Sequence, residues 1–296
     1  MKSGFIAVIG RPNVGKSTLL NGILGEQLSI ISNKAQTTRN KIRFIHTEDR
    51  GQLIFLDTPG VQKPRNKLGK FLLEESLSAL NDVDLILHVV DPSGIGPKEE
   101  MIFEALQGVK ETPVLLIINK MDTLAREELL PLMDRYRERY DFKELIPVSA
   151  LKGEGLDHLV DVIFQYMPEG PLYFPDDMVT DQSERFIVAE KIREKCLKYL
   201  EEEVPHGVAV AIEEMKMRPD GSLMDIGAII YVERDSHKGI IIGKNGSMLK
   251  RIGTSARRSI SAILGERVNL QLWVKVSKNW REKAEQVARF GYRDEE

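Results

Sequence analysis

The sequence predicts an α/β fold for the first half of the chain and a smaller α+β domain for the second half. Short runs rich in Ile, Val and Leu alternate with helical patterns through the first half. This alternation is typical of βαβ units with a mostly parallel sheet. A Pro-rich break and then a basic segment follow. The 296 residues also suit two domains of roughly 100–200 residues each.

Five apolar runs are the expected strands of the first domain. They lie at residues 5–10, 53–60, 85–91, 114–120 and 145–150. Helical patterns follow at 16–24 and 127–140. Ligands of such sheets bind at the carboxyl ends of the strands, so the polar residues that end these runs are the first candidates for a site.

The domain boundary is expected where three prolines and Gly170 fall within residues 168–175. Such a stretch makes a poor helix and a poor strand. We therefore expect a first domain over 1–168, a linker over 169–183, and a second domain over 184–296 that ends in a charged helical tail.

The second domain is expected to begin with an amphipathic helix at 185–200. Two strands follow, joined by a Pro-Asp-Gly turn, and then a glycine loop that precedes a further helix. The last strand is expected to run antiparallel to its neighbour. The strands are predicted at 206–217, 223–235 and 267–276, and the helix after the loop at 247–264.

Composition is that of an ordinary globular protein, with 42% hydrophobic residues and a formal net charge of −3. No apolar run approaches the roughly 18–20 residues that span a bilayer, and the first run is too short for a secretion signal. Cys196 is the only cysteine, which rules out an intrachain disulfide. We expect a buried thiol in a reducing cytoplasm.

Residues 10–18, GRPNVGKST, match the pattern G-x-x-x-x-G-K-[ST] between an expected strand and an expected helix. This is the context of a phosphate-binding loop. Its backbone N–H groups surround a β-phosphate, and the helix N-terminus adds positive potential. Lys16 is expected to reach the β- and γ-phosphates, and Ser17 to offer a hydroxyl to Mg²⁺. The motif predicts a P-loop NTPase.

Two partner motifs end later strands. DTPG at 57–60 supplies an acid for the Mg²⁺ shell and a glycine N–H for the γ-phosphate. In NKMD at 119–122, Asp122 can accept N1–H and N2–H of guanine, a donor pair that adenine lacks. The expected nucleotide-binding residues, including two after the last strand, are Gly10, Arg11, Pro12, Asn13, Val14, Gly15, Lys16, Ser17, Thr18, Asp57, Thr58, Pro59, Gly60, Asn119, Lys120, Asp122, Ser149 and Ala150.

These motifs resemble those of a translation-factor-type GTPase with a Ras-like fold, in which helices cover both faces of the sheet. KAQTTRN at 34–40 is similar to the first switch of that group. The resemblance implies GTP or GDP with Mg²⁺, the metal being held by Ser17, Thr38 and Asp57. Thr37 is an alternative to Thr38, and a polar surface loop is the plainer interpretation of both.

Val61 stands where a Ras-like GTPase has its catalytic Gln. Valine cannot orient or deprotonate water, so the chain resembles the branch with a hydrophobic residue there, and slow intrinsic hydrolysis is expected. An amide oxygen from Asn13 could hold K⁺ where an arginine finger would act; alternatively, Asn13 only shapes its loop. The expected catalytic residues are Lys16, Thr38, Gly60 and Asn13.

The segment from His237 to Arg281 contains ten Lys and Arg residues but a single acid, Glu266. A basic segment in an otherwise acidic chain predicts a polyanion partner, although a solvated helix face is the plainer alternative. Within the segment lies GIIIGKNG. It fits a dinucleotide fingerprint or a plain Asn-Gly hairpin turn less well than the G-x-x-G loop of a KH domain, which clamps about four nucleotides.

The α-β-β-α-α-β order fits a type II KH domain. Two close glycines would admit a sugar-phosphate backbone, the basic residues would neutralise phosphates, and the isoleucines would contact partly bases and partly the core. The expected RNA-binding residues are Lys238, Ile240, Ile241, Ile242, Gly243, Lys244, Asn245, Gly246, Lys250 and Arg251.

Such a GTPase followed by a KH domain resembles the Era family over essentially the whole chain. The resemblance implies binding of small-subunit ribosomal RNA near its 3′ end and a role in maturing the small subunit. It also implies a cytoplasmic, monomeric protein that is partly peripheral on the inner membrane. Two other classes remain open: an RNA-binding factor that nucleotide merely stabilises, and a signalling GTPase of the membrane or cell cycle.

Overall fold

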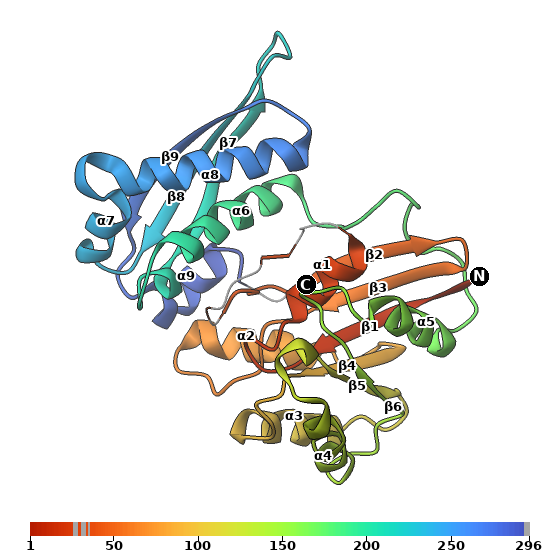
Figure 1. Cartoon of the computed structure of the whole chain (residues 1–296). Helices are drawn as coiled ribbons and strands as arrows, with labels where there is room; N and C mark the ends of the chain where they lie inside the picture. The colour runs from red at the N-terminus through yellow and green to blue at the C-terminus, as the bar shows by residue number, and fades with distance from the viewer. Residues whose placement is uncertain (26–28, 31–33, 35, 293–296) are drawn as a thin grey trace. The chain divides into compact units, whose positions relative to one another are not determined.

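The computed structural model describes residues 1–25, 29–30, 34 and 36–292 (Figure 1). The chain divides into two compact units. The first comprises Met1–Arg65 and Gly69–Asp181, and the second Asn66–Leu68 and Gln182–Glu296. The last four residues of the expected helical tail, 293–296, lie outside the described residues.

The first unit contains a six-stranded sheet in the order β2-β3-β1-β4-β5-β6. All strand pairs are parallel except β2 with β3. All five predicted strands are present, whereas β2 was not predicted. The strands are β1 (Lys2–Ile9), β2 (Ile42–Glu48), β3 (Gly51–Asp57), β4 (Leu85–Val90), β5 (Val114–Ile118) and β6 (Glu144–Pro147).

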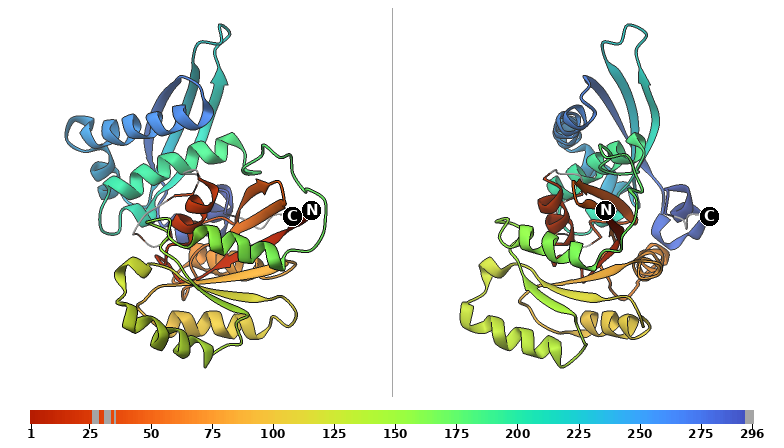
Figure 2. Two further views of the ribbon diagram at one scale, coloured as in Figure 1. Left: turned by 45° about the vertical axis from the view of Figure 1, so that its right-hand side comes forward. Right: turned by 90° about the vertical axis from the view of Figure 1, so that its right-hand side faces the viewer.

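Helices cover both faces of this sheet, as predicted (Figures 1 and 2). Apolar side chains of α2, α3 and α4 pack on one face with the central strands, and α1 packs beside α5 on the other. The helices are α1 (Lys16–Leu24), α2 (Lys67–Ser78), α3 (Pro97–Gln107), α4 (Arg126–Arg137) and α5 (Leu156–Tyr166). Every strand end that bears a predicted motif points to one edge of the sheet.

The expected linker at 169–183 packs largely against the first unit. Gln52 Nε2 donates to the carbonyl of Phe174 over 3.1 Å, and Thr180 Oγ1 donates to the carbonyl of Arg43 over 2.7 Å. These bonds attach the segment to the β2–β3 region up to the division at Asp181.

In its described residues, the second unit packs four α-helices with a three-stranded sheet in the order β7-β8-β9. Its core joins α6 and α8 to one sheet face, with Ile192 and Ile260 among the buried residues. The elements are α6 (Glu184–Tyr199), β7 (Ala209–Met217), β8 (Met224–Val232), α7 (Asp235–Ile242), α8 (Ser247–Leu264), β9 (Val268–Val276) and α9 (Ala284–Arg289). In the part of the chain described, no helix has the length and apolarity to cross a membrane.

The direction of β9 corrects the sequence prediction. We expected an antiparallel strand, but β9 pairs with β8 in parallel. The physical reason is the connection between them, because α7 and α8 form a long crossover that returns the chain to the same end of the sheet before β9 begins.

Candidate nucleotide site and nucleic-acid interface

The motif over residues 10–18 runs from the end of β1 into the first turn of α1. Asn13 and Gly15 both adopt left-handed backbone angles, with φ of 69° and 99°. A Cβ atom on Gly15 would lie 2.3 Å from Asn119 Nδ2, so glycine is required there. Asn119 Nδ2 in turn donates to the carbonyl of Val14 over 2.9 Å. The loop is thus held to the guanine motif by its own backbone.

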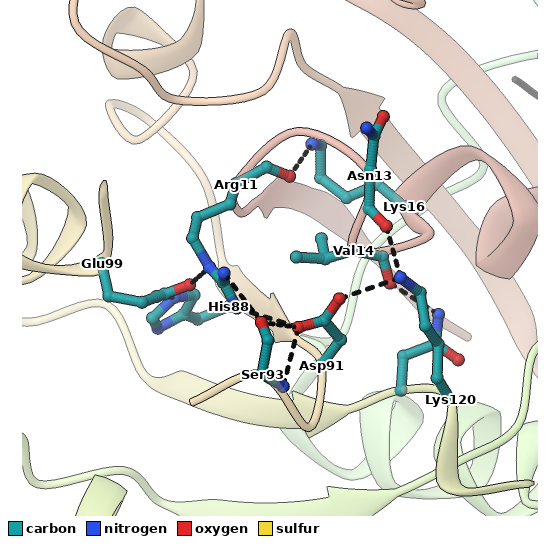
Figure 3. Close-up of polar contacts among 10 residues, drawn as sticks. Arg11, Asn13, Val14, Lys16, His88, Asp91, Ser93, Glu99 and Lys120 are labelled. Atoms are coloured by element: carbon teal, nitrogen blue, oxygen red, sulfur yellow. Dashed lines mark hydrogen bonds and ion pairs between the residues drawn. The ribbon is translucent and has the colours of Figure 1, made fainter. Parts of the chain in front are cut away.

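Lys16 is nearly inaccessible to solvent, with 7% of its surface exposed. Its Nζ donates to the carbonyl of Gly10 at 3.2 Å. It also donates to the carbonyl of Arg11 at 3.4 Å (Figure 3). Burial lowers the pKa of Lys16 to about 8, against the opposing attraction of Asp57. An anionic ligand beside this ammonium would therefore be strongly favoured, because it would restore the cation that burial disfavours.

Three predicted Mg²⁺ ligands converge at the end of β3. Ser17 Oγ and Thr38 Oγ1 each donate to Asp57 Oδ2 over 3.3 Å and lie 3.2 Å apart. Thr37 Oγ1 instead donates to the carbonyl of Lys34 over 2.6 Å. The geometry thus places Thr38, rather than Thr37, at the cluster.

The chemistry of this cluster fits Mg²⁺. Asp57 is fully buried, and its Oδ1 has no hydrogen-bond partner among the described residues. Burial raises the pKa of Asp57, partly offset by Lys16. A carboxylate and two hydroxyls are hard oxygen donors of the kind that Mg²⁺ takes together with phosphate oxygens. Ser29 Oγ, which sequence reasoning missed, also donates to Asp57 Oδ2 over 2.8 Å.

The predicted base-recognition residues meet at the ends of β5 and β6. Ser149 Oγ donates to Asp122 Oδ1 over 2.6 Å, and this bond lowers the pKa of Asp122. The N–H of Ala150 donates to Asn119 Oδ1 over 3.0 Å. Asp122 is therefore an ionised acceptor at neutral pH, as pairing with two guanine donors requires.

Asp91 joins two loops of the site and was not assigned a role from the sequence. Its Oδ1 accepts from Arg11 Nη2 over 3.0 Å, and its Oδ2 accepts from Lys120 Nζ over 2.8 Å (Figure 3). Lys120 Nζ also donates to the carbonyl of Asn13 over 2.6 Å. Burial opposes ionisation of Asp91, but Lys120, Ser93 and Arg11 together outweigh it, and the pKa of Asp91 lies below its ordinary value. The sequence signal that could have identified Asp91 is its position directly after the apolar run that forms β4.

Arg11 points away from the cavity into a buried acid–histidine pair. Its Nε bonds to Glu99, which has no exposed surface, and Glu99 Oε2 lies 2.8 Å from His88 Nε2 (Figure 3). His88 Nδ1 is buried without a described partner. With Glu99 and Asp91 as partners, Arg11 is not placed to act as an arginine finger.

The remaining polar and switch residues surround one cavity at this edge of the sheet. Its lining combines the phosphate loop, the first switch and the end of β3, and includes Pro12, Asn13, Gly15, Lys16, Ser17, Thr18, Thr37, Thr38, Gly60 and Lys120. Thr58 instead turns inward and donates to the carbonyl of Val8 over 2.7 Å. The side chain of Val61 is fully buried in the hydrophobic core, so it does not reach the cavity.

In the second unit, the glycine loop lies between α7 and α8. Gly243 has φ of 71°, and a Cβ atom there would lie 2.9 Å from the backbone N of Met248. Asn245 and Gly246 are also left-handed, with φ of 53° and 76°. These angles give the loop the form of a short, tight turn. The side chains of Lys244 and Asn245 in this turn are exposed.

The three isoleucines before the loop are divided between core and surface. Ile241 is fully buried, whereas Ile240 is 49% exposed and Ile242 is half-buried. A depression beside the loop is lined by Gly246, Leu249, Lys250, Gly253, Thr254, Arg257, Leu270 and Leu272. Such a cleft combines apolar walls with cations, so it suits bases together with their phosphates. Ile241 presents no side chain to it.

Two family models match the chain in sequence. Residues 5–120 match the 50S ribosome-binding GTPase family, and residues 203–281 match the KH domain. The first match covers the phosphate loop and ends within the guanine motif. The second covers the glycine loop and the basic segment around it.

Relatives match over almost the whole length. The chain is 55% identical to GTPase Era of Clostridioides difficile strain 630 over 99% of both chains. It is 51% identical to GTPase Era of Alkaliphilus oremlandii strain OhILAs over 98% of this chain and 99% of that one.

Two solved structures share the fold at a TM-score of 0.95 and 43% identity, each over 99% of both chains. One is Era in complex with MgGDPNP and nucleotides 1506–1542 of 16S ribosomal RNA. The other is a variant of Aquifex aeolicus Era bound to GDP and AlF4⁻.

Proposed function

The chain belongs to the Era family of GTPases, and from this premise we propose that it is a slowly hydrolysing GTP switch for small-subunit assembly. It binds 16S-type ribosomal RNA near the 3′ end through its KH domain. The observation that carries this proposal is the presence in one chain of a guanine-nucleotide site and a glycine loop set in a basic surface. The related Era bound to MgGDPNP and a 16S segment supports the same pairing.

The nucleotide would lie on the phosphate loop with its base at Asp122. Ser17, Thr38 and Asp57 would hold Mg²⁺, which neutralises phosphate charge when bound. Lys16 would pair with the β- and γ-phosphates, whose negative charge would favour its protonated form. Thr38 and Gly60 belong to segments that respond to the γ-phosphate in such switches, so they are where the two nucleotide states would differ.

Hydrolysis is proposed to be slow because Val61, which stands at the position of the catalytic Gln, cannot orient water. The buried Val61 supports this, since its side chain packs in the core. Arg11 forms ion pairs with Asp91 and Glu99, so its side chain does not take over this role in hydrolysis. We propose that Asn13 helps to hold K⁺ beside the phosphates. Turnover measured in K⁺ and in Na⁺ at equal ionic strength tests this, and equal rates would exclude a role for K⁺.

The switch itself is tested by measuring RNA affinity in two nucleotide states. The chain loaded with a non-hydrolysable GTP analogue and the chain loaded with GDP are titrated with RNA spanning nucleotides 1506–1542. We expect the triphosphate form to bind more tightly, because hydrolysis should release the RNA. Equal affinities would refute the switch. Turnover that RNA does not change would favour instead an RNA-binding factor that nucleotide merely stabilises.

Subunit preference provides a second test. We expect the protein to sediment with the small ribosomal subunit in the GTP state, and association with the large subunit alone would contradict the proposal. We further propose a cytoplasmic monomer with a fraction peripheral on the inner membrane, which rests on the family resemblance. Cell fractionation with and without a high-salt wash, and sedimentation of the purified chain, test these two points.

A further inference from the structure

Helix α8 carries basic residues on both flanks of its exposed face. Ile252, Ala256 and Ile260 are buried, and they define the inner face because they recur every fourth residue. On one flank, Arg257 lines the cleft beside the glycine loop. On the other flank, Arg251 and Arg258 line a second depression that also includes Tyr199, the last residue of α6. Lys250 and Thr254 border both depressions.

The second flank forms a shallow groove with α6, here called the α6–α8 groove. Every residue of its lining bears either a hydroxyl or a cation. It is lined by Tyr199, Ser247, Lys250, Arg251, Thr254, Ser255 and Arg258. It differs from the cleft in having no Leu in its lining, so its surface suits a charged backbone better than a base.

One cation of the groove is held in place by an aromatic ring. The Cζ atom of Arg251 lies 4.3 Å from the ring centroid of Tyr199, a cation–π distance. Tyr199 Oη and Ser255 Oγ are 3.1 Å apart and hydrogen-bonded. This bond, together with Lys198 and Arg251, lowers the pKa of Tyr199. The Tyr199 ring thus holds the Arg251 guanidinium in place, and the nearby Lys198 adds to the local positive charge.

Among the described residues, no carboxylate forms an ion pair with a cation of the groove. Within the described part of the chain, Lys250, Arg251 and Arg258 take part in no ion pair. The basic residues of α6 behave differently: Arg193 pairs with Glu190 at 2.5 Å, and Lys195 pairs with Glu194 at the same distance. The α8 cations therefore carry uncompensated charge at an exposed surface, which favours an anionic ligand.

We propose that the α6–α8 groove is a second phosphate-binding site, which holds the sugar-phosphate backbone of RNA outside the segment clamped by the glycine loop. The inference rests on the proposed function. Guanidinium groups bind phosphate in bidentate fashion and hydroxyls add hydrogen bonds. The groove is continuous with the cleft across Lys250 and Thr254, so one RNA can occupy both. The proposal assigns Arg251 to the groove rather than to the cleft.

The size of the RNA supports two sites. A glycine loop of this kind clamps about four nucleotides, whereas the RNA in the related complex spans nucleotides 1506–1542. Backbone contacts position RNA without reading its bases. The groove would therefore add affinity for longer RNA and leave the sequence preference of the cleft unaltered.

The test compares a long and a short RNA on one variant of the full chain. The variant Arg251→Gln/Arg258→Gln is titrated with RNA spanning nucleotides 1506–1542 and with a six-nucleotide fragment that the parent chain binds. Affinity for the long RNA should fall at least tenfold, and the slope of log affinity against log salt should become shallower by about 1–2, since each lost phosphate contact removes about 0.7–0.9. Affinity for the fragment should stay within about twofold, which also shows that the domain is folded.

The matched control removes the same charge from the other face of the sheet. Lys216 and Lys275 are exposed residues of β7 and β9, and each alternates with neighbours that pack into the core. The variant Lys216→Gln/Lys275→Gln should bind the long RNA with less than about a twofold loss. An equal loss in the control would overturn the groove, because the effect would then be one of net charge alone.

Two further outcomes separate this inference from the proposed function. Unchanged affinity of Arg251→Gln/Arg258→Gln for the long RNA would overturn the groove while leaving the cleft intact. If that variant instead loses binding only to vesicles that contain anionic phospholipid, the groove is a membrane site and the proposal is wrong. Gly246→Asp should weaken binding of both RNAs, and retention of the short fragment would count against the proposed function itself.

Discussion

A single carboxylate, Asp91, holds the phosphate loop and the guanine motif at a fixed separation. Each of its oxygens accepts from a different loop, through Arg11 and Lys120. Lys120 in turn reaches the backbone of Asn13. Nucleotide affinity should therefore depend on Asp91 even though the residue makes its contacts with protein groups.

We predict that Asp91→Asn weakens GDP and GTP binding about equally, by about tenfold. Loss of a hydrogen bond to a charged group costs about 1.5–3 kcal/mol. Only part of this free energy should be lost from nucleotide binding, because the bond joins protein groups. KM should rise while kcat stays near the parent value, because the phosphate groups that react are untouched. Fluorescent-nucleotide binding and steady-state turnover measure both.

Ser93→Ala is the control for this prediction. It removes the 3.1 Å bond from Arg11 Nη1 to Ser93 Oγ and the 2.5 Å bond from Ser93 Oγ to Asp91 Oδ1, but it leaves both Asp91 ion pairs. Its nucleotide affinity should stay within about twofold of the parent. A fall in kcat without a rise in KM for Asp91→Asn would contradict the positioning role.

The motif residues could be predicted because each motif is continuous in sequence and tied to a strand end. The network of Asp91, Glu99 and His88 could not, because it depends on which side chains of β4 and α3 meet across the core. Asp91 at least stands where a strand ends. For Glu99, in the first turn of α3, no sequence signal distinguishes a buried ion pair from an ordinary favourable helix start.

At the scale of elements, the β7–β8 hairpin is stabilised at its outer end by an exposed ion pair. Arg218 donates to both oxygens of Asp225 over 2.7 and 2.9 Å, and Asn269 of β9 donates to Asp225 over 2.7 Å. The bonds from Arg218 and then Asn269 lower the pKa of Asp225 to about 2. The carboxylate thus ties all three strands together.

This pKa predicts a specific acid dependence of stability. The folded state holds the ionised form, so the contribution is complete above the unfolded pKa near 3.9 and is lost as the pH falls toward 2. Asp225→Asn should therefore flatten the decline of unfolding free energy between about pH 4 and pH 2, although other carboxylates will keep part of it. Urea denaturation of both chains across this range measures the difference, and parallel curves would rule out the contribution of Asp225.

Two elements show where sequence patterns stop being informative. In β2, Phe44 and Ile45 are adjacent apolar residues and both are buried, so the strand lacks the clean alternation that would have revealed it. The direction of β9 depends on the crossover through α7 and α8 rather than on its own residues. The residues of β9 predict that it is a strand, but they do not predict the direction in which it runs.

At the scale of the whole molecule, the proposed function requires the second unit to bind RNA through a loop with left-handed backbone angles. We predict that Gly243→Asp/Gly246→Asp lowers RNA affinity by more than tenfold. A Cβ at Gly243 would contact Met248, and both new carboxylates would repel phosphate. Filter binding to RNA, alongside flotation with anionic vesicles, shows which partner is lost first, and we expect RNA.

Gly221→Asp/Gly265→Asp is the matched control for this loop. Both glycines have positive φ, of 66° and 69°, and neither would bring a Cβ within 4 Å of another group. The pair adds the same charge to the same unit outside the glycine loop. Equal loss of RNA binding in the two double variants would show that added charge, rather than the loop, explains the result.

The uneven charge along the chain has a consequence for how the protein meets its partner. Since the whole chain is at −3 and residues 237–281 are at +9, the remaining residues sum to −12. Near a polyanion, the acidic residues are repelled while the basic segment is attracted. The molecule should therefore approach RNA with its basic segment facing the RNA before contact is made. This orientation raises the fraction of productive encounters. Because salt screens the attraction, the association rate should fall steeply as salt is added.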